Sequence, residues 1–205
     1  MLTESSDRYA SPQEVASAIK TLSRLEPGAL PYALFAEMAK RMPAPVTEII
    51  PLRRVGRRVQ VLLTRRAVSD TIWPGQEHTP GSAMRAADAV HGMPLKPEVK
   101  RVLGGELGKA ANNLLTYLGQ EIRDTRRGGE LAHIFYTEVS DETSVGTWYD
   151  IDELPWKTII AHQIPMIISA GTAFAQQTGA EMPSKEHRGA YLFHFSPGVQ
   201  YTFED

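Results

Sequence analysis

The chain has 205 residues, of which 42% are hydrophobic and 22% charged, a composition typical of ordinary globular proteins. This excludes a collagen, a disordered tail and a disulfide-rich miniprotein, and the length is ample for one main buried core. The 22 basic and 24 acidic residues give a formal net charge of -2, so there is no overall positive field to attract nucleic acid. The absence of cysteine excludes disulfides, a thiol nucleophile and thiolate metal sites.

Neither end of the chain nor its apolar segments indicate a membrane location. The N-terminal segment MLTESSDRYASPQ has no apolar signal-peptide core. The most apolar stretch, residues 158–174, is interrupted by His162, Gln163 and Pro165 and is too broken to cross a bilayer. We therefore expect a cytoplasmic protein with neither nucleic acid nor a membrane as a partner.

Residues 1–45 are expected to form a helical extension. Ser11, Pro12 and Glu14 form a capping-box pattern that predicts the start of a helix. Apolar residues follow at helical spacing at Val15, Ala18, Ile19, Leu22 and Leu25. A second helix is expected from Pro31, with the apolar stripe Leu34, Phe35, Met38 and Met42. Both stripes are expected to pack against other apolar surface, and they favour a homodimer.

From Val46 the hydrophobic period changes from helical to strand-like. Residues 46–52 and 58–64 flank a short turn that contains Gly56, which predicts a β-hairpin. Residues 67–96 carry glycine, proline and histidine with few periodic apolar residues. We interpret this segment as a long structured loop, of the kind that often carries function.

Residues 97–118 return to helical spacing, which predicts a helix. Gly104 and Gly105 lie inside it, so either the helix breaks there or another group approaches its backbone closely. Strands are predicted at 131–139 and 147–151.

A last long helix is expected from Leu154 to about Gln177, with a kink at Pro165. A short strand is expected near 199–203. The main domain is therefore predicted over residues 46–180, followed by a C-terminal tail over 181–205 that contains the short strand.

The order of these elements and four motifs resemble the Nudix hydrolase family over residues 46–177. The motifs are Leu-Leu-Thr-Arg-Arg at 62–66, Trp-Pro-Gly-Gln-x-His-x-Pro-Gly at 73–81, Arg-x-Leu-x-x-Glu-Leu-Gly at 101–108, and Trp-x-x-x-Asp-Glu-Leu at 148–154. The resemblance implies an α/β fold, namely a Nudix-like α/β/α sandwich with a mixed sheet, to which the N-terminal helical extension is added.

The third motif falls on the Nudix box, whose glutamates at positions i, i+3 and i+4 of one helix hold Mg²⁺ that polarises a diphosphate and activates a water. Val102 and Gly105 occupy two of the three glutamate positions, and Ser82 replaces a box glycine. The resemblance therefore implies a degenerate box. In it, Glu106 is the remaining catalytic and metal-binding carboxylate, and Asp88 is a second ligand for Mg²⁺ or Mn²⁺.

Other carboxylates are candidates for the missing ligands. Glu98 precedes Glu106 by eight residues, which at about 1.5 Å per residue places their backbones about 12 Å apart in a helix. One Mg²⁺ cannot bridge that distance unless the helix breaks. The downstream acids Glu121, Glu130 and Glu138 would have to fold back towards the site, and the alternative is that they are solvated surface carboxylates.

Four residues are candidates for binding a diphosphate ligand. Arg65 and Arg66 end the second predicted strand, Arg101 lies on the box helix, and His78 lies in the long loop. Each has a structural alternative, because Arg101 can form an ion pair that props the loop and His78 can hydrogen-bond the turn.

Two further groups are interpreted as structural. Arg53, Arg54, Arg57 and Arg58 are expected to solubilise the hairpin edge. Trp73, Trp148 and Trp156 are expected in the core or in a cleft wall.

Three functional hypotheses follow. The first is a Nudix-fold protein with a degenerate box that binds a nucleoside-diphosphate-linked or similar small molecule with weak or no hydrolysis. The second is an active, metal-dependent diphosphate hydrolase that uses carboxylates outside the box. The third is a structural or protein-interaction module. Because fold does not fix function, the step from the resemblance to an activity is an analogy.

Overall fold

The structure is a computed structural model that describes residues 10–25, 30–85, 96–107, 114–139, 145–184 and 200–202. Its centre is one mixed sheet in the order β3-β2-β1-β6-β5-β8, with β4 added to β1 and β7 added to β2. β1 and β6 are parallel and the other pairs are antiparallel. The strands are β1 (Ala44–Val55), β2 (Arg58–Arg65), β3 (Glu77–His78), β4 (Gly81–Ala83), β5 (Leu114–Thr125), β6 (Gly128–Glu138), β7 (Thr147–Asp150) and β8 (Gln200–Thr202).

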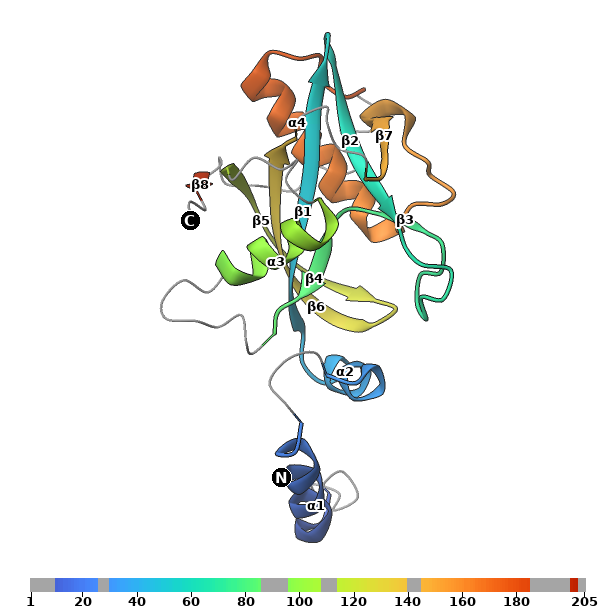
Figure 1. Cartoon of the computed structure of the whole chain (residues 1–205), viewed down its shortest axis with the longest axis vertical. Coiled ribbons are helices and arrows are strands. Elements are labelled where there is room, and N and C mark those ends of the chain that lie inside the picture. The colour runs from blue at the N-terminus through green and yellow to red at the C-terminus, as the bar shows by residue number, and fades with distance from the viewer. Residues whose placement is uncertain are drawn as a thin grey trace, which may run out of the picture.

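Helices cover both faces of this sheet. In Figure 1, α3 (Lys96–Glu106) lies in front of the sheet and α4 (Ile164–Thr178) lies behind it. Each helix packs on its own apolar cluster. On the α3 face the cluster is Ile49, Leu62, Val99, Val102, Leu103, Leu107, Leu115 and Phe135. On the α4 face the larger cluster joins residues such as Ile50, Leu52, Ile134, Met166 and Ile167. The predicted α/β/α sandwich with a mixed sheet is confirmed.

The N-terminal extension contains α1 (Pro12–Leu22) and α2 (Tyr32–Ala39). The predicted capping box is present, because the Ser11 hydroxyl accepts from the Glu14 amide and the Glu14 carboxylate accepts from the Ser11 amide. The first apolar stripe does not pack as expected. α1 has no buried residue within the described chain, and Val15, Ile19 and Leu22 are exposed. The homodimer stays a prediction.

Two parts of the predicted helix at 97–118 are wrong. Its last residues belong to β5, which pairs with β6 over most of its length. The leucine spacing fits a helix, but Leu114–Thr125 is a strand that pairs with β6 and β8, with a register shift between Tyr117 and Gly119. Further, α3 continues through Gly104 and Gly105 without a break, and a Cβ at either position would have no neighbour within 4 Å. No close approach therefore explains these two glycines.

The last predicted helix begins later than expected. After the short turns η4 (Ile151–Glu153) and η5 (Ala161–Gln163), α4 starts at Ile164. Pro165 occupies the first turn of α4, where its missing amide hydrogen is not needed, so it begins the helix and does not kink it. The predicted hairpin of β1 and β2 is confirmed, as are β6 and β7, within a few residues.

The sheet splits in the middle, and this split positions the candidate site. β1 and β2 pair with each other only from Leu52 to Val55 on the β1 side. Beyond that point β1 pairs with β4, and β2 pairs with β3. The segment 77–83 therefore lies between the two strands. Across the described ranges, no helix has the length and apolar character that a membrane span requires.

Candidate functional site

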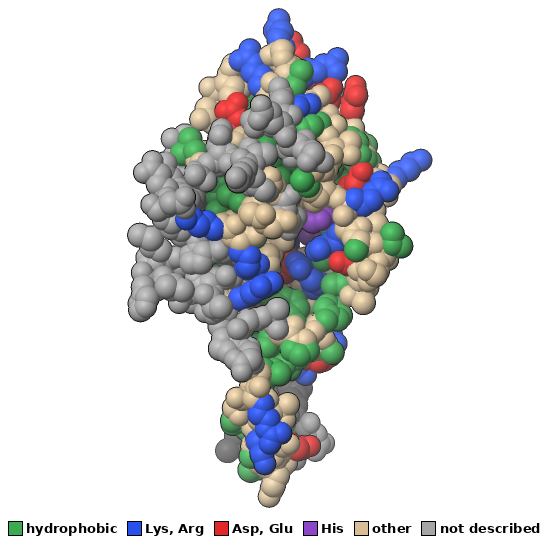
Figure 2. Space-filling model, in the orientation of Figure 1, with side chains coloured by type: hydrophobic (Ala, Val, Ile, Leu, Met, Phe, Trp, Pro, Cys, Tyr) green, Lys and Arg blue, Asp and Glu red, His purple; other side chains and the backbone are tan. Residues whose placement is uncertain are grey.

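A small polar cleft lies at this split. It is enclosed by the segment 77–83, the loop after β2, the turn between β5 and β6, and η5. Its cavity volume of ≈ 10 Å³ is sufficient for about one water molecule. Figure 2 shows a hollow in the molecule with histidine and basic side chains in its wall. The lining residues are Glu48, Arg66, Trp73, His78, Thr79, Gly81, Arg127, Ile160, His162 and Gln163.

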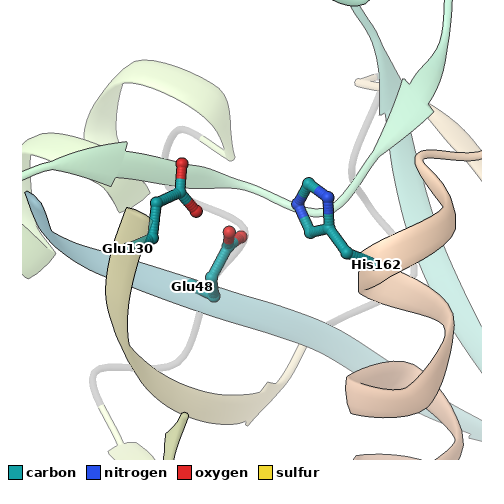
Figure 3. A group of neighbouring side chains, drawn as sticks. All are labelled: Glu48, Glu130 and His162. Carbon is teal, nitrogen blue, oxygen red and sulfur yellow. The ribbon is translucent and has the colours of Figure 1, made fainter. Parts of the chain in front are cut away.

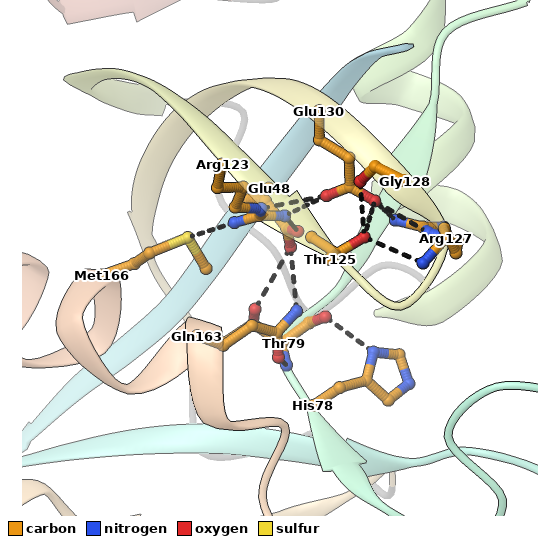
Figure 4. Close-up of polar contacts among 10 residues, drawn as sticks. All are labelled: Glu48, His78, Thr79, Arg123, Thr125, Arg127, Gly128, Glu130, Gln163 and Met166. Carbon is orange, nitrogen blue, oxygen red and sulfur yellow. Dashed lines mark hydrogen bonds and ion pairs between the residues drawn. The ribbon is translucent and has the colours of Figure 1, made fainter. Parts of the chain in front are cut away.

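Below the cleft, Arg123 joins two buried glutamates (Figure 4). Its Nε and Nη2 lie 2.9 Å and 2.8 Å from Glu130 Oε2, and Nη2 also donates to Glu48 Oε1. The three side chains are at most 4% exposed. They lie on the α4 face of the sheet, where Arg123 also contacts the Met166 sulfur at 3.1 Å. Charges this deeply buried are tolerated only when they are paired and hydrogen-bonded.

A second guanidinium connects this buried cluster to the cleft. Arg127 donates from Nε to Glu130 Oε1 at 2.8 Å, and its Nη2 lies 2.5 Å from the same oxygen. The Arg127 guanidinium also lies 4.9 Å from the ring centroid of Trp73, and that of Arg66 lies 5.5 Å from it. Trp73 is only 4% exposed. It is thus a wall that supports two arginines, as the sequence predicted for a core or cleft-wall residue.

The loop after β2 holds Trp73 and Arg66 in place. The Asp70 carboxylate accepts from the amides of Ile72 and Trp73, both at 2.9 Å, and lies 3.5 Å from Arg66 Nη1. Burial raises the pKa of Asp70, but these two backbone hydrogen bonds and Arg66 outweigh it and leave the pKa below its ordinary value. The loop is therefore ordered by its own polar contacts.

Glu48, Glu130 and His162 have the residue types of a metal site, and they point towards a common space (Figure 3). One ligand atom from each lies within 4.8 Å of the others. However, all four carboxylate oxygens already accept hydrogen bonds. Glu48 Oε2 accepts from Gln163 Nε2 at 3.1 Å, and the other three accept from Arg123 or Arg127. The guanidiniums supply the positive charge here, so the group does not fit a divalent ion.

The box positions of α3 offer little more to a metal. Val102 is buried in the apolar cluster of the α3 face, and Gly105 has no side chain. Glu106 is the last residue of α3, and its side chain lies outside the described part of the structure, as does all of Asp88. Among the described box positions, none therefore presents a metal-binding oxygen.

The two buried glutamates have opposite pKa shifts. Burial raises the pKa of Glu48, because its one guanidinium partner, Arg123, does not offset the loss of water. Burial also acts on Glu130, but Arg127 and Arg123 together outweigh it and lower the pKa. Burial tends to lower the pKa of Arg123, whereas Glu48 and Glu130 raise it to a net value above the ordinary one. Glu130 and Arg123 are therefore charged at neutral pH.

The two histidines of the cleft are neutral. Burial lowers the pKa of both His78 and His162 to about 4. His78 Nδ1 lies 2.7 Å from the Thr79 carbonyl, which can only accept, so Nδ1 carries the hydrogen and Nε2 accepts from the Thr64 hydroxyl at 3.1 Å. Both His78 nitrogens are thus engaged. His162 instead contacts the edge of Trp73, with ring centroids 5.5 Å apart.

The structure separates the residues that the sequence singled out for ligand binding. Arg66 and His78 line the cleft. Arg65 lies beside it, with a mostly exposed side chain 3.4 Å from the buried Glu77 carboxylate. Arg101 lies on the α3 face, where it donates to Ser82 Oγ at 2.8 Å and to the Ala83 carbonyl at 3.2 Å. Arg101 thereby holds β4 through hydrogen bonds.

The downstream acids lie on the strands β5 and β6. Glu130 is buried on the α4 face with Arg123, so the sheet separates it from α3. Burial raises the pKa of Glu121, which lies on β5, and Glu138 is exposed. The idea that Glu130 folds back to the box helix is corrected by its place on the opposite face. Of the three tryptophans, Trp156 is 41% exposed and is not a core residue.

Sequence reasoning missed Glu48, Arg123, Arg127 and His162 as members of one site. The available signal for Glu48 was its position in a strand between apolar residues, where a buried carboxylate requires a partner. Nothing in the local sequence pairs it with Arg123, which lies 75 residues away along the chain. Gly81 ends the loop motif at 73–81. A Cβ at Gly81 would collide with the Glu48 carboxylate, so the glycine admits that carboxylate.

No family model matches the chain, and no curated protein matches it. Solved structures do match. NrtR from Shewanella oneidensis is 16% identical, with a TM-score of 0.53, over 65% of this chain and 64% of that chain. NrtR complexed with a 27mer DNA is 16% identical, with a TM-score of 0.51, over 64% and 62%. The NUDIX domain of NrtR complexed with ADP ribose is 14% identical, with a TM-score of 0.49, over 74% and 95%.

The match spans less than two thirds of the NrtR chain in the first two structures. At this level of identity the similarity shows the fold and leaves the activity open.

Proposed function

Since this chain has the Nudix fold, we propose that it binds a small molecule containing a diphosphate group, such as a nucleoside-diphosphate-linked compound, and hydrolyses it weakly or not at all. The observation that carries this proposal is the arrangement of two guanidiniums, Arg66 and Arg127, in the wall of a cleft whose carboxylates are already paired; because the cleft itself holds about one water, the phosphate group would lie at its mouth. This arrangement favours holding an anion over activating a water.

The arginines suit a phosphate group. A guanidinium offers several N–H donors in a plane, which match phosphate oxygens in a fork. Arg127 is held by Glu130 and Trp73, so little side-chain freedom is lost when it binds. Arg66 Nε is buried and has no hydrogen-bond partner, and an unsatisfied buried donor is costly unless a ligand engages it. Exposed Arg65 supplies a further positive charge beside the cleft.

The weak hydrolysis follows from the state of the carboxylates. Val102 and Gly105 bring no metal-binding oxygen to α3, and Glu48 and Glu130 are paired with arginines on the other face. Loss of a general base alone lowers a rate by about 10²–10⁴-fold, and loss of metal ligands lowers it further. If Mg²⁺ or Mn²⁺ is used, Glu106 and Asp88 are the proposed ligands.

The remaining predicted residues have supporting roles in this proposal. His78 keeps the loop before β4 in position through its two engaged nitrogens, and Arg101 props β4 through Ser82. Both would affect ligand binding through the shape of the cleft.

Calorimetry and a turnover assay together test the proposal. ADP-ribose and other nucleoside-diphosphate-linked compounds are titrated into the full chain with Mg²⁺ or Mn²⁺ and assayed for product release. We expect binding that Arg66→Ala and Arg127→Ala each weaken about tenfold or more, the loss expected for a charge-assisted contact of about 1.5–3 kcal/mol. Arg58→Ala, which removes an exposed arginine paired with Asp150, is the matched control.

Two results would contradict the proposal. Absence of binding across the panel in a folded sample favours a structural or protein-interaction role. Robust metal-dependent turnover that Glu106→Ala abolishes shows an active hydrolase, which is the second hypothesis.

A further inference from the structure

The N-terminal extension touches the same turn that carries Arg127. α2 ends at Ala39, which is buried against the turn between β5 and β6. Gly128 in this turn has a φ of 117°, and a Cβ there would lie 2.8 Å from both the carbonyl carbon and the carbonyl oxygen of Ala39. Only glycine combines this backbone conformation with this contact. The close packing of α2 on the turn therefore depends on Gly128.

The turn is stiff and contacts the cleft on its other side. The Thr125 hydroxyl accepts from the Arg127 amide at 3.1 Å and donates to the Gly128 carbonyl at 3.0 Å. Arg126 donates to the Ile72 carbonyl at 3.3 Å, next to Trp73. Arg127 lies on Trp73 and pairs with Glu130. A displacement of the turn at Gly128 therefore moves the Arg127 guanidinium relative to the cleft.

We propose that docking of α2 against Gly128 positions Arg127 for the anionic ligand, so that α2 docking and anion binding are thermodynamically coupled. This inference rests on the proposed function. It gives the N-terminal extension a role in the site, although no residue of α1 or α2 lines the cleft. Coupling of this kind is reciprocal. A partner or a modification that releases α2 weakens ligand binding, and ligand binding strengthens α2 docking by the same factor.

Adjacent glycines provide the test variant and its control. Gly128→Ala forces a Cβ against the Ala39 backbone and also strains the turn at a φ of 117°, whereas at Gly129 the nearest atom to a Cβ is the Ala39 oxygen at 3.6 Å, an ordinary contact. Hydrogen exchange of the unaltered chain separates the coupling from this strain. Neither residue lines the cleft. The probe is inorganic pyrophosphate, titrated by calorimetry into the full chain. We expect Gly128→Ala to lower the affinity for pyrophosphate at least about fivefold, which is the lower end of typical allosteric coupling. Gly129→Ala should bind pyrophosphate as tightly as the unaltered chain does.

Hydrogen exchange of the unaltered chain gives a second, independent measurement. If the two events are coupled, pyrophosphate slows amide exchange in residues 32–39 by a factor that matches the affinity lost in Gly128→Ala. Hydrogen exchange tests the coupling in the unaltered chain even if Gly128→Ala fails to fold. Unchanged exchange in 32–39 while pyrophosphate is bound overturns the coupling and leaves the proposed function intact. Absence of binding by the unaltered chain of pyrophosphate and of every diphosphate-linked compound overturns the proposed function itself.

Discussion

On the α3 face of the sheet, Val102 and Phe135 lie in a wholly apolar cluster, whereas on the α4 face Arg123 joins two glutamates that are equally buried. The family resemblance places the reactive carboxylates on the α3 side, at the box helix. In this chain the buried ion-pair cluster that the structure describes lies on the other side. The two faces thus differ in what they bury, because the α3 face covers an apolar cluster and the α4 face also encloses an ion-pair cluster.

The box motif of α3 has a clear structural role in this chain. The frame residues of the box still do structural work, since Arg101 holds β4 through Ser82 and Leu103 and Leu107 pack on the sheet. Those contacts hold β4 and α3 in place on the sheet. The charged cluster on the α4 face depends instead on pairing, and three tests probe the stability of the two faces.

The largest effect is expected from Arg123→Met. It leaves Glu48 and Glu130 buried with their shared partner removed, and breaking such a pair costs about 3–5 kcal/mol. Urea unfolding at pH 7 measures this loss. Arg58→Ala, which breaks an exposed ion pair with Asp150, should leave the midpoint almost unchanged. Equal stability of Arg123→Met and the unaltered chain would show that the cluster contributes little to the fold.

A smaller loss in the free energy of unfolding is expected from Val102→Thr on the α3 face. The side chain keeps its shape, but its hydroxyl enters an apolar cluster, at a cost of about 1–3 kcal/mol. Urea unfolding at pH 7 measures this loss as well. Val68→Thr is the control, because Val68 is 86% exposed. A fully stable Val102→Thr would mean that α3 can accept polar groups, and the contrast between the two faces would weaken.

The third test concerns how the stability contributed by the two buried glutamates changes with pH. The pKa of Glu48 is raised above its ordinary value of 4.5, mainly by burial. The stability that the protonated Glu48 contributes is therefore lost as the pH rises above 4.5. Glu48→Gln should therefore gain stability relative to the unaltered chain with rising pH. The pKa of Glu130 is lowered, because Arg127 and Arg123 outweigh burial. The stability that the ionised Glu130 contributes is lost as the pH falls below 4.5. The difference in the free energy of unfolding between the unaltered chain and Glu130→Gln should therefore shrink below this pH.

Urea unfolding from pH 3.5 upward, in steps of about half a unit, measures both trends, since each unit of pKa shift corresponds to about 1.4 kcal/mol. Parallel pH profiles for the two variants would contradict the opposite shifts. The comparison needs no ligand, so it tests the buried cluster independently of the proposed function.

Local signals predicted much of the fold. The capping box of α1, the hairpin around Gly56 and the strand β6 follow from patterns within about ten residues, and the structure confirms them. The errors have a common cause. Leu114 and Leu118 are spaced as in a helix, but both lie in β5, where Leu114 pairs with Thr202 of β8 and Leu118 falls at the register shift between Tyr117 and Gly119. Pro165 predicts a kink when taken by itself, but it fits the first turn of α4.

The sequence by itself determined the class of fold and two residues of the cleft, Arg66 and His78, because motif order and hydrophobic period are properties of the chain. Only the tertiary structure decided which charges meet. Glu48 and Arg123 are brought together by the parallel pairing of β1 with β6 and the hairpin of β5 with β6. Ion pairing acts over a few ångströms in space, and no local pattern reports that distance for residues far apart in the chain.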